Sequence, residues 1–314
     1  MNHQYARLYS FASTQASSVI TNDDLAQMMD TSDEWIQART GIAQRCWVKN
    51  PEELVDMAVT AAKKSLDMAN VSIHDVDVII VATSSYHRTW PSMASSIQGA
   101  LGGQCMAFDV NAACSGFIYI THIARSFIES GQHKRVLLIA ADAGSQVIDR
   151  TDRRTAVIFG DGAGAALMEA ADKPGILYSA CYSNGQDAEL LVAQNVDGKP
   201  VVTMDGRRVF KNAVSCFDAI AQEVASATGI SIEDVNCVIP HQANQRILSS
   251  IQRNHAIPDD KMVSIIAQYG NTVAASIPMA LAHASQQSFK EGDLVLLKSF
   301  GAGTTWGCVL FKAI

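Results

Sequence analysis

The chain has 314 residues, of which 48% are hydrophobic and 18% are charged. This is enough apolar material for one large domain or two smaller ones, and it excludes a disulfide-stabilised miniprotein and a long disordered chain. Because 31 Asp and Glu residues outnumber 24 Lys and Arg residues, giving a net charge of −7, nucleic-acid binding is disfavoured as the main function. The seven cysteines are scattered and lack metal-site spacing, so no metal is expected. We find neither a signal peptide nor a membrane-spanning run of about 18 apolar residues, which predicts a cytoplasmic protein without a membrane partner.

In chain order, the first strong signal is an amphipathic helix over residues 54–69, followed over 71–80 by a short turn and a buried strand. A second helix over 209–229 leads into residues 230–239, which repeat the same pattern. The two copies match at Ser72/Ser231, Ile73/Ile232, Asp75/Asp234, Val76/Val235 and Ile80/Ile239.

The parallel between the halves continues downstream. A helix end, a short apolar strand and a small-residue turn follow one another at 129–131, 136–138 and 143–145, and again at 291–292, 295–297 and 302–304. This order predicts an internal duplication into α/β halves over 1–170 and 171–314, each with a mostly parallel sheet. Chance similarity of a common helix-to-strand connector is the alternative. No linker rich in Pro, Gly or Ser separates the halves, so we expect them to pack as one body.

Cys114 is the strongest chemical candidate in the first half. It follows a short strand and a run of small residues, and it precedes a predicted helix over 117–128. Unpaired N–H groups and partial positive charge at a helix N-terminus favour a thiolate, and such N–H groups can also hold an oxyanion. Cys114 is therefore a candidate nucleophile toward an acyl group, with a buried structural cysteine as the alternative.

The second half supplies two polar candidates. His241 directly follows the duplicated strand, in a polar segment over 240–246, and Asn271 precedes a small-residue helix start that is pseudo-symmetric to the Cys114 turn. Polar groups at the end of a buried strand commonly serve a site. The duplication therefore predicts that Cys114, His241 and Asn271 converge, although His241 alone could equally be a core histidine.

These motifs resemble those of β-ketoacyl-acyl carrier protein synthase III, a condensing enzyme of the thiolase superfamily. The similarity covers nearly the whole chain and includes the segments 31–41, 151–155, 159–164, 204–211 and 300–306. The resemblance implies a thiolase-like α/β fold, with two duplicated halves packed as layers in the order αβαβα. It also implies a homodimer.

The resemblance implies an acyltransferase that starts fatty acid biosynthesis. Cys114 would take a short acyl group, acetyl foremost, from a coenzyme A thioester, and malonyl-acyl carrier protein would then lose carbon dioxide and attack that group. His241 and Asn271 would hold the enolate oxygen. The backbone of Ala302 would help to form a second oxyanion hole, and Phe300 would favour decarboxylation. Neither a cofactor nor a metal is expected.

The resemblance also implies binding residues. Coenzyme A would be recognised by Trp35, Arg39, Arg153 and Asn244, with Arg153 sandwiching the adenine against Trp35. The acidic carrier protein would meet a basic rim, although a solvated charge cluster is the alternative. That rim comprises Arg207, Arg208, Lys211, Arg246 and Arg253.

Two departures from the family pattern stand out. No Gly occurs before Gly41 and no Pro before Pro51, so the first strand and its turn are not assured. Trp90 stands where many members have Phe, in a loop that closes the partner's acyl tunnel, so the acyl pocket is expected to be short. The alternatives are a specialised relative that condenses or hydrolyses other acyl or aroyl thioesters and a non-catalytic partner that retains the fold.

Overall fold

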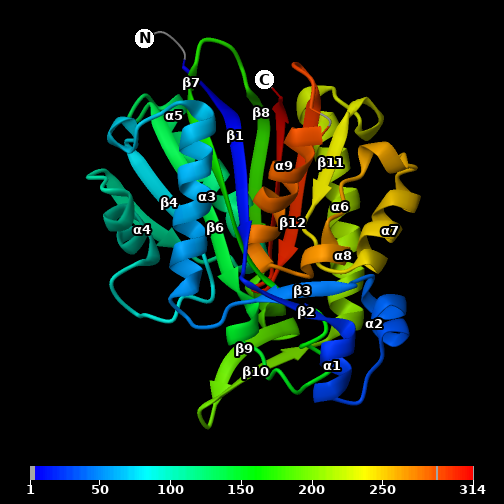
Figure 1. Ribbon diagram of the computed structural model, residues 1–314. Helices are drawn as coiled ribbons and strands as arrows, with labels where there is room; N and C mark the ends of the chain where they lie inside the picture. The colour runs from blue at the N-terminus through cyan, green and yellow to red at the C-terminus, as the bar shows by residue number, and fades with distance from the viewer. Residues whose placement is uncertain (1–3, 288, 314) are drawn as a thin grey trace.

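The computed structural model describes residues 4–287 and 289–313 and contains two large sheets (Figure 1). The first sheet has five strands in the order β1 (Tyr5–Gln15), β7 (Asp161–Ala171), β6 (Arg135–Ala143), β4 (Val78–Ala82) and β5 (Met106–Val110). The second has four, in the order β11 (Cys237–Pro240), β12 (Leu294–Gly301), β13 (Thr305–Lys312) and β8 (Ile176–Ser183).

Helices cover both outer faces and fill the space between the sheets, as Figure 1 shows. Alternate residues along each strand face opposite layers, so each sheet contributes to two hydrophobic clusters. The fold is therefore the expected layered αβαβα arrangement. The expectation of a mostly parallel sheet in each half is wrong as to pairing, because β7 and β13 each run antiparallel to both of their neighbours. From one outer face to the other, the helical layers are α3 (Glu53–Ala69) with α4 (Met93–Leu101), α5 (Gly116–Glu129) with α9 (Ser276–Gln287), and α6 (Gly206–Thr228) with α7 (Gln245–Asn254).

The duplication seen in the sequence recurs in the backbone. Helix α3 and helix α6 each end at a left-handed residue, Asn70 and Gly229. Each is followed by a short 3₁₀ turn, η1 (Ile73–Asp75) or η5 (Ile232–Asp234), and then by a buried strand. Strands β1, β7, β6 and β4 correspond in order to β8, β13, β12 and β11. Chance similarity of the connectors does not explain this agreement.

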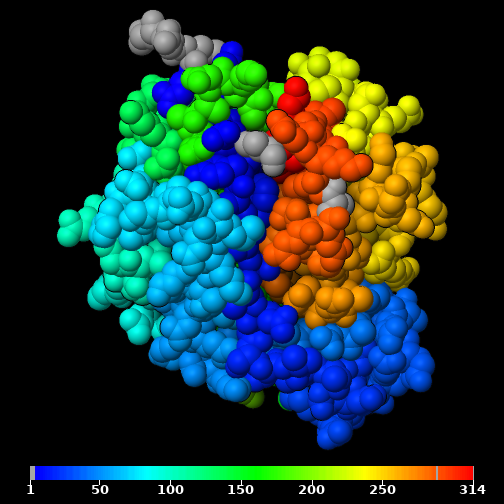
Figure 2. All heavy atoms as spheres, turned by 45° about the horizontal axis from the view of Figure 1, so that its top comes forward, coloured from blue at the N-terminus to red at the C-terminus, as the bar shows by residue number. Residues whose placement is uncertain are grey.

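The first strand forms despite its unusual composition. Along β1 alternate residues are buried, and the strand pairs antiparallel with β7. Figure 2 shows β1 (dark blue) reaching the surface between α3 (cyan) and α9 (orange). Short residues such as Ser and Ala suit this position because two helices pack against the strand.

Smaller elements complete the chain. Two small sheets of two strands each lie outside the main sheets: β2 (Ser18–Thr21) with β3 (Gln44–Trp47), and β9 (Leu191–Val196) with β10 (Lys199–Met204). The remaining short helices are α1 (Asn22–Met28), α2 (Asp33–Thr40) and α8 (Ile266–Tyr269). The remaining 3₁₀ turns are η2 (Ala113–Ser115), η3 (Gly144–Gln146), η4 (Gly185–Leu190), η6 (Asp259–Lys261) and η7 (Val273–Ala275). Among the described residues, no helix combines the length and apolarity that crossing a membrane requires.

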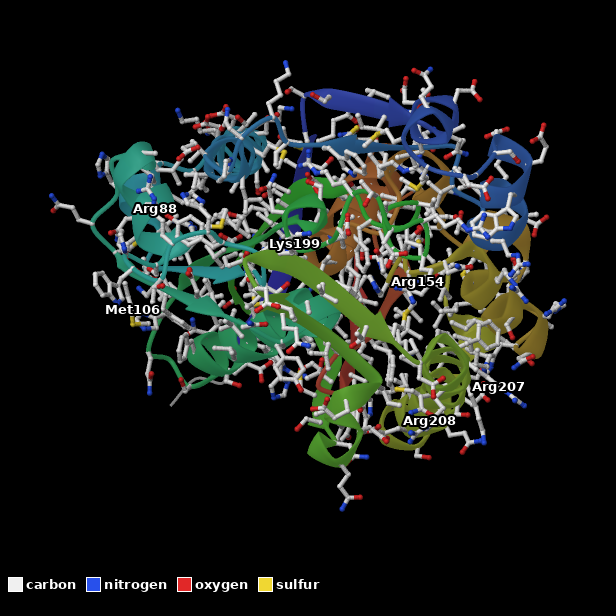
Figure 3. The ribbon with its side chains drawn as sticks, turned by 90° about the horizontal axis from the view of Figure 1, so that it is seen from below. Arg88, Met106, Arg154, Lys199, Arg207 and Arg208 are labelled. Atoms are coloured by element: carbon white, nitrogen blue, oxygen red, sulfur yellow. The ribbon has the colours of Figure 1, made fainter. Side chains whose placement is uncertain are left out.

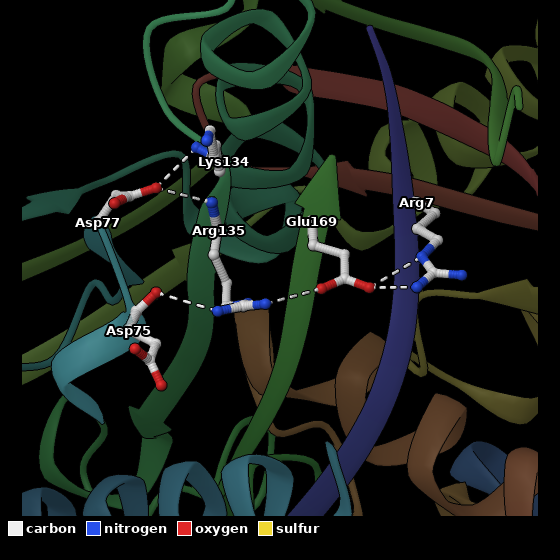
Figure 4. Close-up of polar contacts among 6 residues, drawn as sticks. All are labelled: Arg7, Asp75, Asp77, Lys134, Arg135 and Glu169. Atoms are coloured by element: carbon white, nitrogen blue, oxygen red, sulfur yellow. Dashed lines mark hydrogen bonds and ion pairs between the residues drawn. The ribbon is translucent and has the colours of Figure 1, made fainter. Parts of the chain in front are cut away.

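A chain of ion pairs and hydrogen bonds ties the amino ends of β1 and β6 and the turn before β4 to the carboxyl end of the antiparallel β7 (Figure 4). Glu169 accepts from Arg7 Nε at 3.0 Å and from Arg135 Nη2 at 3.3 Å, and Asp77 accepts from the Arg135 backbone N–H at 2.9 Å. These contacts join β1, β7, β6 and the turn before β4. The carboxyl ends of the parallel strands, where ligands bind in such sheets, lie at the opposite end of the fold.

Candidate active site

The predicted catalytic residues meet at one cavity. Cys114 follows β5 and His241 follows β11, while Asn271 lies between α8 and η7. Each side chain is only 6% exposed, and all three line a cavity of about 480 Å³. The structure therefore brings together three residues that are far apart in the sequence.

The turn that carries Cys114 is strained and firmly held. Ala113 has a φ of 45°, in the left-handed region that non-glycine residues rarely adopt, and the Asn111 side chain accepts its backbone N–H at 3.2 Å. Ser299 Oγ donates to the Cys114 carbonyl at 2.8 Å, and Ser115 Oγ donates to the Thr305 carbonyl at 2.9 Å. The second half of the molecule thus fixes the turn that carries Cys114.

Burial, not the helix terminus, dominates the ionisation of Cys114. Desolvation and then the charge of Asp142 raise the pKa of Cys114 to about 12, against a smaller opposing effect of a backbone hydrogen bond. Burial thus opposes the thiolate that the predicted helix start would favour. The thiol needs a base to accept its proton.

His241 is suited to that task because it is neutral. Burial and then the charge of Lys298 lower the pKa of His241 to about 3. Its Nδ1 lies 2.7 Å from Ser276 Oγ, a hydrogen bond that orients the ring, and its backbone N–H donates to the Lys298 carbonyl at 2.8 Å. A neutral imidazole can accept a proton or donate a hydrogen bond through Nε2.

Asn271 repeats the geometry of the Cys114 turn. Its Oδ1 accepts the Val273 backbone N–H at 2.9 Å, as Asn111 does for Ala113, and Val273 also has a left-handed φ, of 51°. The residue matching Asn271 is therefore Asn111, and Ala274 matches Cys114. Because Oδ1 is occupied by Val273, the Nδ2 group of Asn271 is the donor available to a ligand.

The turn after β12 approaches Cys114 closely. A Cβ added to Gly301 would lie 2.9 Å from the Cys114 nitrogen, so this position admits only glycine without a shift. Phe300 lines the cavity, whereas Ala302 is half-buried in the following turn and is not among the cavity residues. The backbone after Phe300 thus lies beside the nucleophile.

Asp142 links the two halves behind the site, and sequence reasoning missed it. This fully buried carboxylate accepts from the Ser84 backbone N–H at 2.8 Å, from Ser85 Oγ at 2.8 Å and from the Ala274 backbone N–H at 3.1 Å. Burial raises the pKa of Asp142. Its only sequence signal is one acidic residue at the end of an apolar strand.

The predicted coenzyme A residues lie close together, and Asn244 among them lines the cavity. The guanidinium carbons of Arg39 and Arg153 lie 5.3 and 4.8 Å from the Trp35 ring centroid. Asn244 caps α7, lines the cavity and donates to the Arg39 carbonyl at 3.2 Å. An adenine between Arg153 and Trp35 needs roughly 7 Å between the planes, about 3.5 Å per stacking contact, so Arg153 must move to admit it.

The predicted basic rim is exposed. All five residues have exposed side chains, and Arg207 and Arg246 also line the cavity. Arg208 is paired with Asp187 at 3.0 Å, which reduces its net contribution. Figure 3 shows Arg207 and Arg208 together at one side of the molecule.

Trp90 does not line the cavity of its own chain. It lies in the loop between β4 and α4 and is 81% exposed. Any role in an acyl pocket therefore requires another copy of the chain.

The rest of the cavity wall is mainly apolar. Sequence reasoning also missed these wall residues, because apolar side chains that face a cavity have the same pattern as those that face a core. They include Ile158, Phe159, Leu191, Phe210, Ala213, Ile247 and Ile251, with Lys298 as a buried charged exception. Within 4–287 and 289–313, no group of three or more His, Cys, Asp or Glu residues could hold a metal.

Comparison with known families and relatives gives a consistent result. Residues 108–185 match the family described as 3-oxoacyl-[acyl-carrier-protein (ACP)] synthase III, and residues 225–313 match its C-terminal domain. A β-ketoacyl-[acyl-carrier-protein] synthase III of Neisseria gonorrhoeae is 42% identical, with 98% of this chain and 99% of the relative covered.

Solved structures agree. The 3-oxoacyl-[acyl-carrier-protein] synthase III of Aquifex aeolicus has a TM-score of 0.93 at 42% identity, covering 98% of this chain and 99% of that chain. The priming β-ketosynthase of the R1128 polyketide pathway has a TM-score of 0.94 at 30% identity, covering 99% and 97%.

Proposed function

Because this chain belongs to the 3-oxoacyl-[acyl-carrier-protein] synthase III family, we propose that it condenses acetyl-coenzyme A with malonyl-acyl carrier protein to begin fatty acid biosynthesis. The observation that carries the proposal is the buried cavity shared by Cys114, His241 and Asn271. A thiol, a neutral imidazole and an amide are the groups that acyl transfer followed by decarboxylation requires.

In the first half-reaction, Cys114 attacks the acyl carbonyl of the coenzyme A thioester. Its thiol proton passes to neutral His241 as the C–S bond forms, and the proton then leaves with the coenzyme A thiol. The N–H groups of Cys114 and Ala302 hold the oxyanion, which the close approach of Gly301 to Cys114 supports.

In the second half-reaction, the malonyl thioester enters the same cavity. Its carboxylate leaves as carbon dioxide, and the electron pair of the broken bond forms an enolate whose carbon attacks the acyl group on Cys114. His241 Nε2 and Asn271 Nδ2 donate to the enolate oxygen, while the apolar ring of Phe300 disfavours the carboxylate. We propose that no metal or cofactor takes part.

Substrate entry uses the cavity mouth. Trp35, Arg39 and Arg153 receive the adenine end of coenzyme A, with Arg153 swinging away from Trp35, and Asn244 lies toward the pantetheine arm. The carrier protein docks on the basic rim of Arg207, Lys211, Arg246 and Arg253, to which Arg208 contributes less.

Charge reversal tests the rim. Arg246→Glu should raise the KM for malonyl-acyl carrier protein about tenfold, because an acidic partner meets a reversed charge, while acetylation by acetyl-coenzyme A keeps its rate. Lys63→Glu, exposed on α3, is the matched control. An unchanged KM in Arg246→Glu would remove this residue from the docking surface.

We propose that the enzyme is a homodimer. Strand β5 pairs with β4 alone among the described residues, which leaves one edge unpaired, and Met106 on β5 is 45% exposed. Figure 3 shows Met106 and Arg88 on the same side of the molecule, away from Arg207. In a dimer across this edge, Trp90 would reach the partner's acyl pocket. Light scattering on the purified protein measures the mass directly.

A second candidate is priming with a different starter. The similarity to a priming β-ketosynthase of a polyketide pathway favours it. Rates of Cys114 acylation from a panel of acetyl-, propionyl-, butyryl-, octanoyl- and benzoyl-coenzyme A decide between the two.

One experiment tests the reaction itself. The protein is incubated with radiolabelled acetyl-coenzyme A and then with malonyl-acyl carrier protein. We expect label on Cys114, release of carbon dioxide and labelled acetoacetyl-acyl carrier protein, and we expect none of these from Cys114→Ser. Label at another residue would contradict the nucleophile, and label without carbon dioxide release would favour the specialised relative.

A further inference from the structure

Lys298 is a charged side chain inside an apolar strand. It is 2% exposed and lies on β12 between Leu296 and Phe300, on the same face of the sheet. The residue of the first half that corresponds to Lys298 is Ile139, because Ile139 pairs with Val81 on β4 as Lys298 pairs with Pro240 on β11. The duplicated scaffold therefore accepts an aliphatic residue at this position, and the lysine is not required by the fold.

The ammonium of Lys298 is poorly compensated. Nζ donates to the Ala213 carbonyl at 2.9 Å and lies 5.8 and 5.9 Å from the ring centroids of Phe217 and Phe300. Over the described part of the chain, no ion pair joins it to an acidic side chain. A buried cation without a counter-ion is unfavourable unless an anion approaches during function.

Opposing effects act on its charge. Burial lowers the pKa of Lys298, whereas Cys216 and Asp218 on α6 and Cys308 on β13 raise it. Because burial raises the pKa of Cys216 and of Cys308, their thiols are neutral, and Asp218 is the group among the three that favours the ammonium, without a close ion pair.

Lys298 lies beside the proposed enolate site. Its carbonyl accepts the backbone N–H of His241, and both residues line the cavity that contains Asn271. Because Lys298 lines the same buried cavity as His241, its charge disfavours positive charge at the imidazole, in agreement with the lowered pKa of His241. The same field must favour negative charge there.

Other charged groups face this region less directly. Arg207 on α6 and Arg246 on α7 line the cavity, but their exposed side chains are screened by solvent. Cys114 on η2 is neutral while its thiol is protonated. Lys298 on β12 is therefore the buried cation whose field acts on His241.

We propose that Lys298 is a positioning residue for malonyl decarboxylation, whose buried ammonium stabilises the negative charge that forms between His241 and Asn271. This inference rests on the proposed function. As the bond to the carboxylate breaks, its electron pair moves onto the thioester oxygen and carbon dioxide leaves, while Lys298 acts through space and transfers no proton. Acyl transfer to Cys114 places its oxyanion elsewhere, in the hole formed with Ala302, so that step should depend less on Lys298.

Two substitutions remove the charge in different ways. Lys298→Met keeps the alkyl stem, and Lys298→Gln keeps an N–H donor for the Ala213 carbonyl. Both should lower kcat for carbon dioxide release about tenfold, with the KM for malonyl-acyl carrier protein within twofold of the original. Acetylation should not slow, because His241 accepts the Cys114 proton more readily without a neighbouring cation. Leu296→Met, on the same face of β12, is the packing control and should leave both steps unchanged.

A second readout does not depend on catalysis. In ¹³C-histidine-labelled protein, the His241 signal, assigned by its loss in His241→Ala, should stay that of neutral imidazole down to pH 5. Its apparent pKa should rise in Lys298→Met and Lys298→Gln and stay unchanged in Leu296→Met. This titration reports the field of Lys298 even if a variant is inactive.

The outcomes separate this inference from the proposed function. Unchanged carbon dioxide release, equal loss of acetylation and release, or an unmoved His241 titration would each overturn the role of Lys298. An original protein that releases no carbon dioxide would instead overturn the proposed function.

Discussion

The three residues at the centre of the site differ in how visible their properties are in the sequence. The positions of Cys114, His241 and Asn271 could be predicted because the duplication places strand ends and helix starts at one edge. The ionisation of Cys114 and His241 could not, because it depends on burial by residues from distant segments. Lys298 and Asp142 were missed for the same reason, since a lone charge in an apolar run shows no partner in the sequence.

The thiol of Cys114 should ionise only at high pH in the unliganded protein. Because burial and Asp142 raise its pKa to about 12, the thiolate fraction grows about tenfold per pH unit below that value. Alkylation by iodoacetamide should therefore accelerate without a plateau from pH 7 to pH 10, measured against the background rate of Cys114→Ser. A plateau near pH 7 would show that the helix terminus outweighs burial.

Loss of the imidazole should separate the two half-reactions. In His241→Ala, acetylation of Cys114 should slow but persist, because solvent can take the thiol proton in place of the imidazole, while condensation falls about a hundredfold or more because one donor to the enolate oxygen is removed. Mass spectrometry of the acetylated protein and carbon dioxide release measure the two steps. Equal loss of both would mean that His241 is indispensable as the base for Cys114.

Among the elements, β12 and the turn after it connect the most parts of the site. This strand holds the Cys114 carbonyl through Ser299, pairs with the strand before His241 and ends at Gly301 against the nucleophile. The sequence repeat predicted a buried strand within 230–239 and another at 295–297, but not that the two pair. The close approach at Gly301 did not, because glycine in a turn has many causes.

A side chain at position 301 should slow acyl transfer to Cys114. In Gly301→Ala the new Cβ would lie 2.9 Å from the Cys114 nitrogen and 3.0 Å from its Cβ, so the turn must shift. We expect acetylation by acetyl-coenzyme A to fall at least about tenfold, since a displacement of about 1 Å in an active site can cost a hundredfold. The control Gly99→Ala, where an added Cβ meets nothing within 4 Å, should keep full activity. Normal acetylation in Gly301→Ala would show that the turn tolerates displacement.

At the scale of the whole molecule, the duplication was predictable because the hydrophobic pattern repeats along the chain. The layer order αβαβα was implied by the resemblance to β-ketoacyl-acyl carrier protein synthase III and not by periodicity. The division at residues 170 and 171 and a cytoplasmic location stay predictions. How copies assemble is invisible to periodicity, because an unpaired strand such as β5 has the same pattern as a paired one.

The choice of acyl starter depends on how copies of the chain assemble, since Trp90 can act only on a neighbouring copy. The large indole should shorten the partner's acyl pocket, so acetyl-coenzyme A should acylate the original protein faster than octanoyl-coenzyme A. In Trp90→Ala the preference should move toward octanoyl by about tenfold, while Met68→Ala, exposed on α3, should not change it. Competition between the two thioesters, read by intact-protein mass, gives the ratio. Faster octanoyl transfer in the original protein would contradict the steric explanation.

The paired turns at Ala113 and Val273 limit how this enzyme could be redesigned. Their backbones match, so Ala274→Cys would place a second thiol in a copy of the nucleophile's turn. Yet the Ala274 N–H is already bound to the carboxylate of Asp142, whereas the Cys114 N–H is proposed to hold the oxyanion. The engineered thiol would therefore face a negative charge and lack its anion hole, and grafting a nucleophile by symmetry would fail unless that carboxylate were replaced as well.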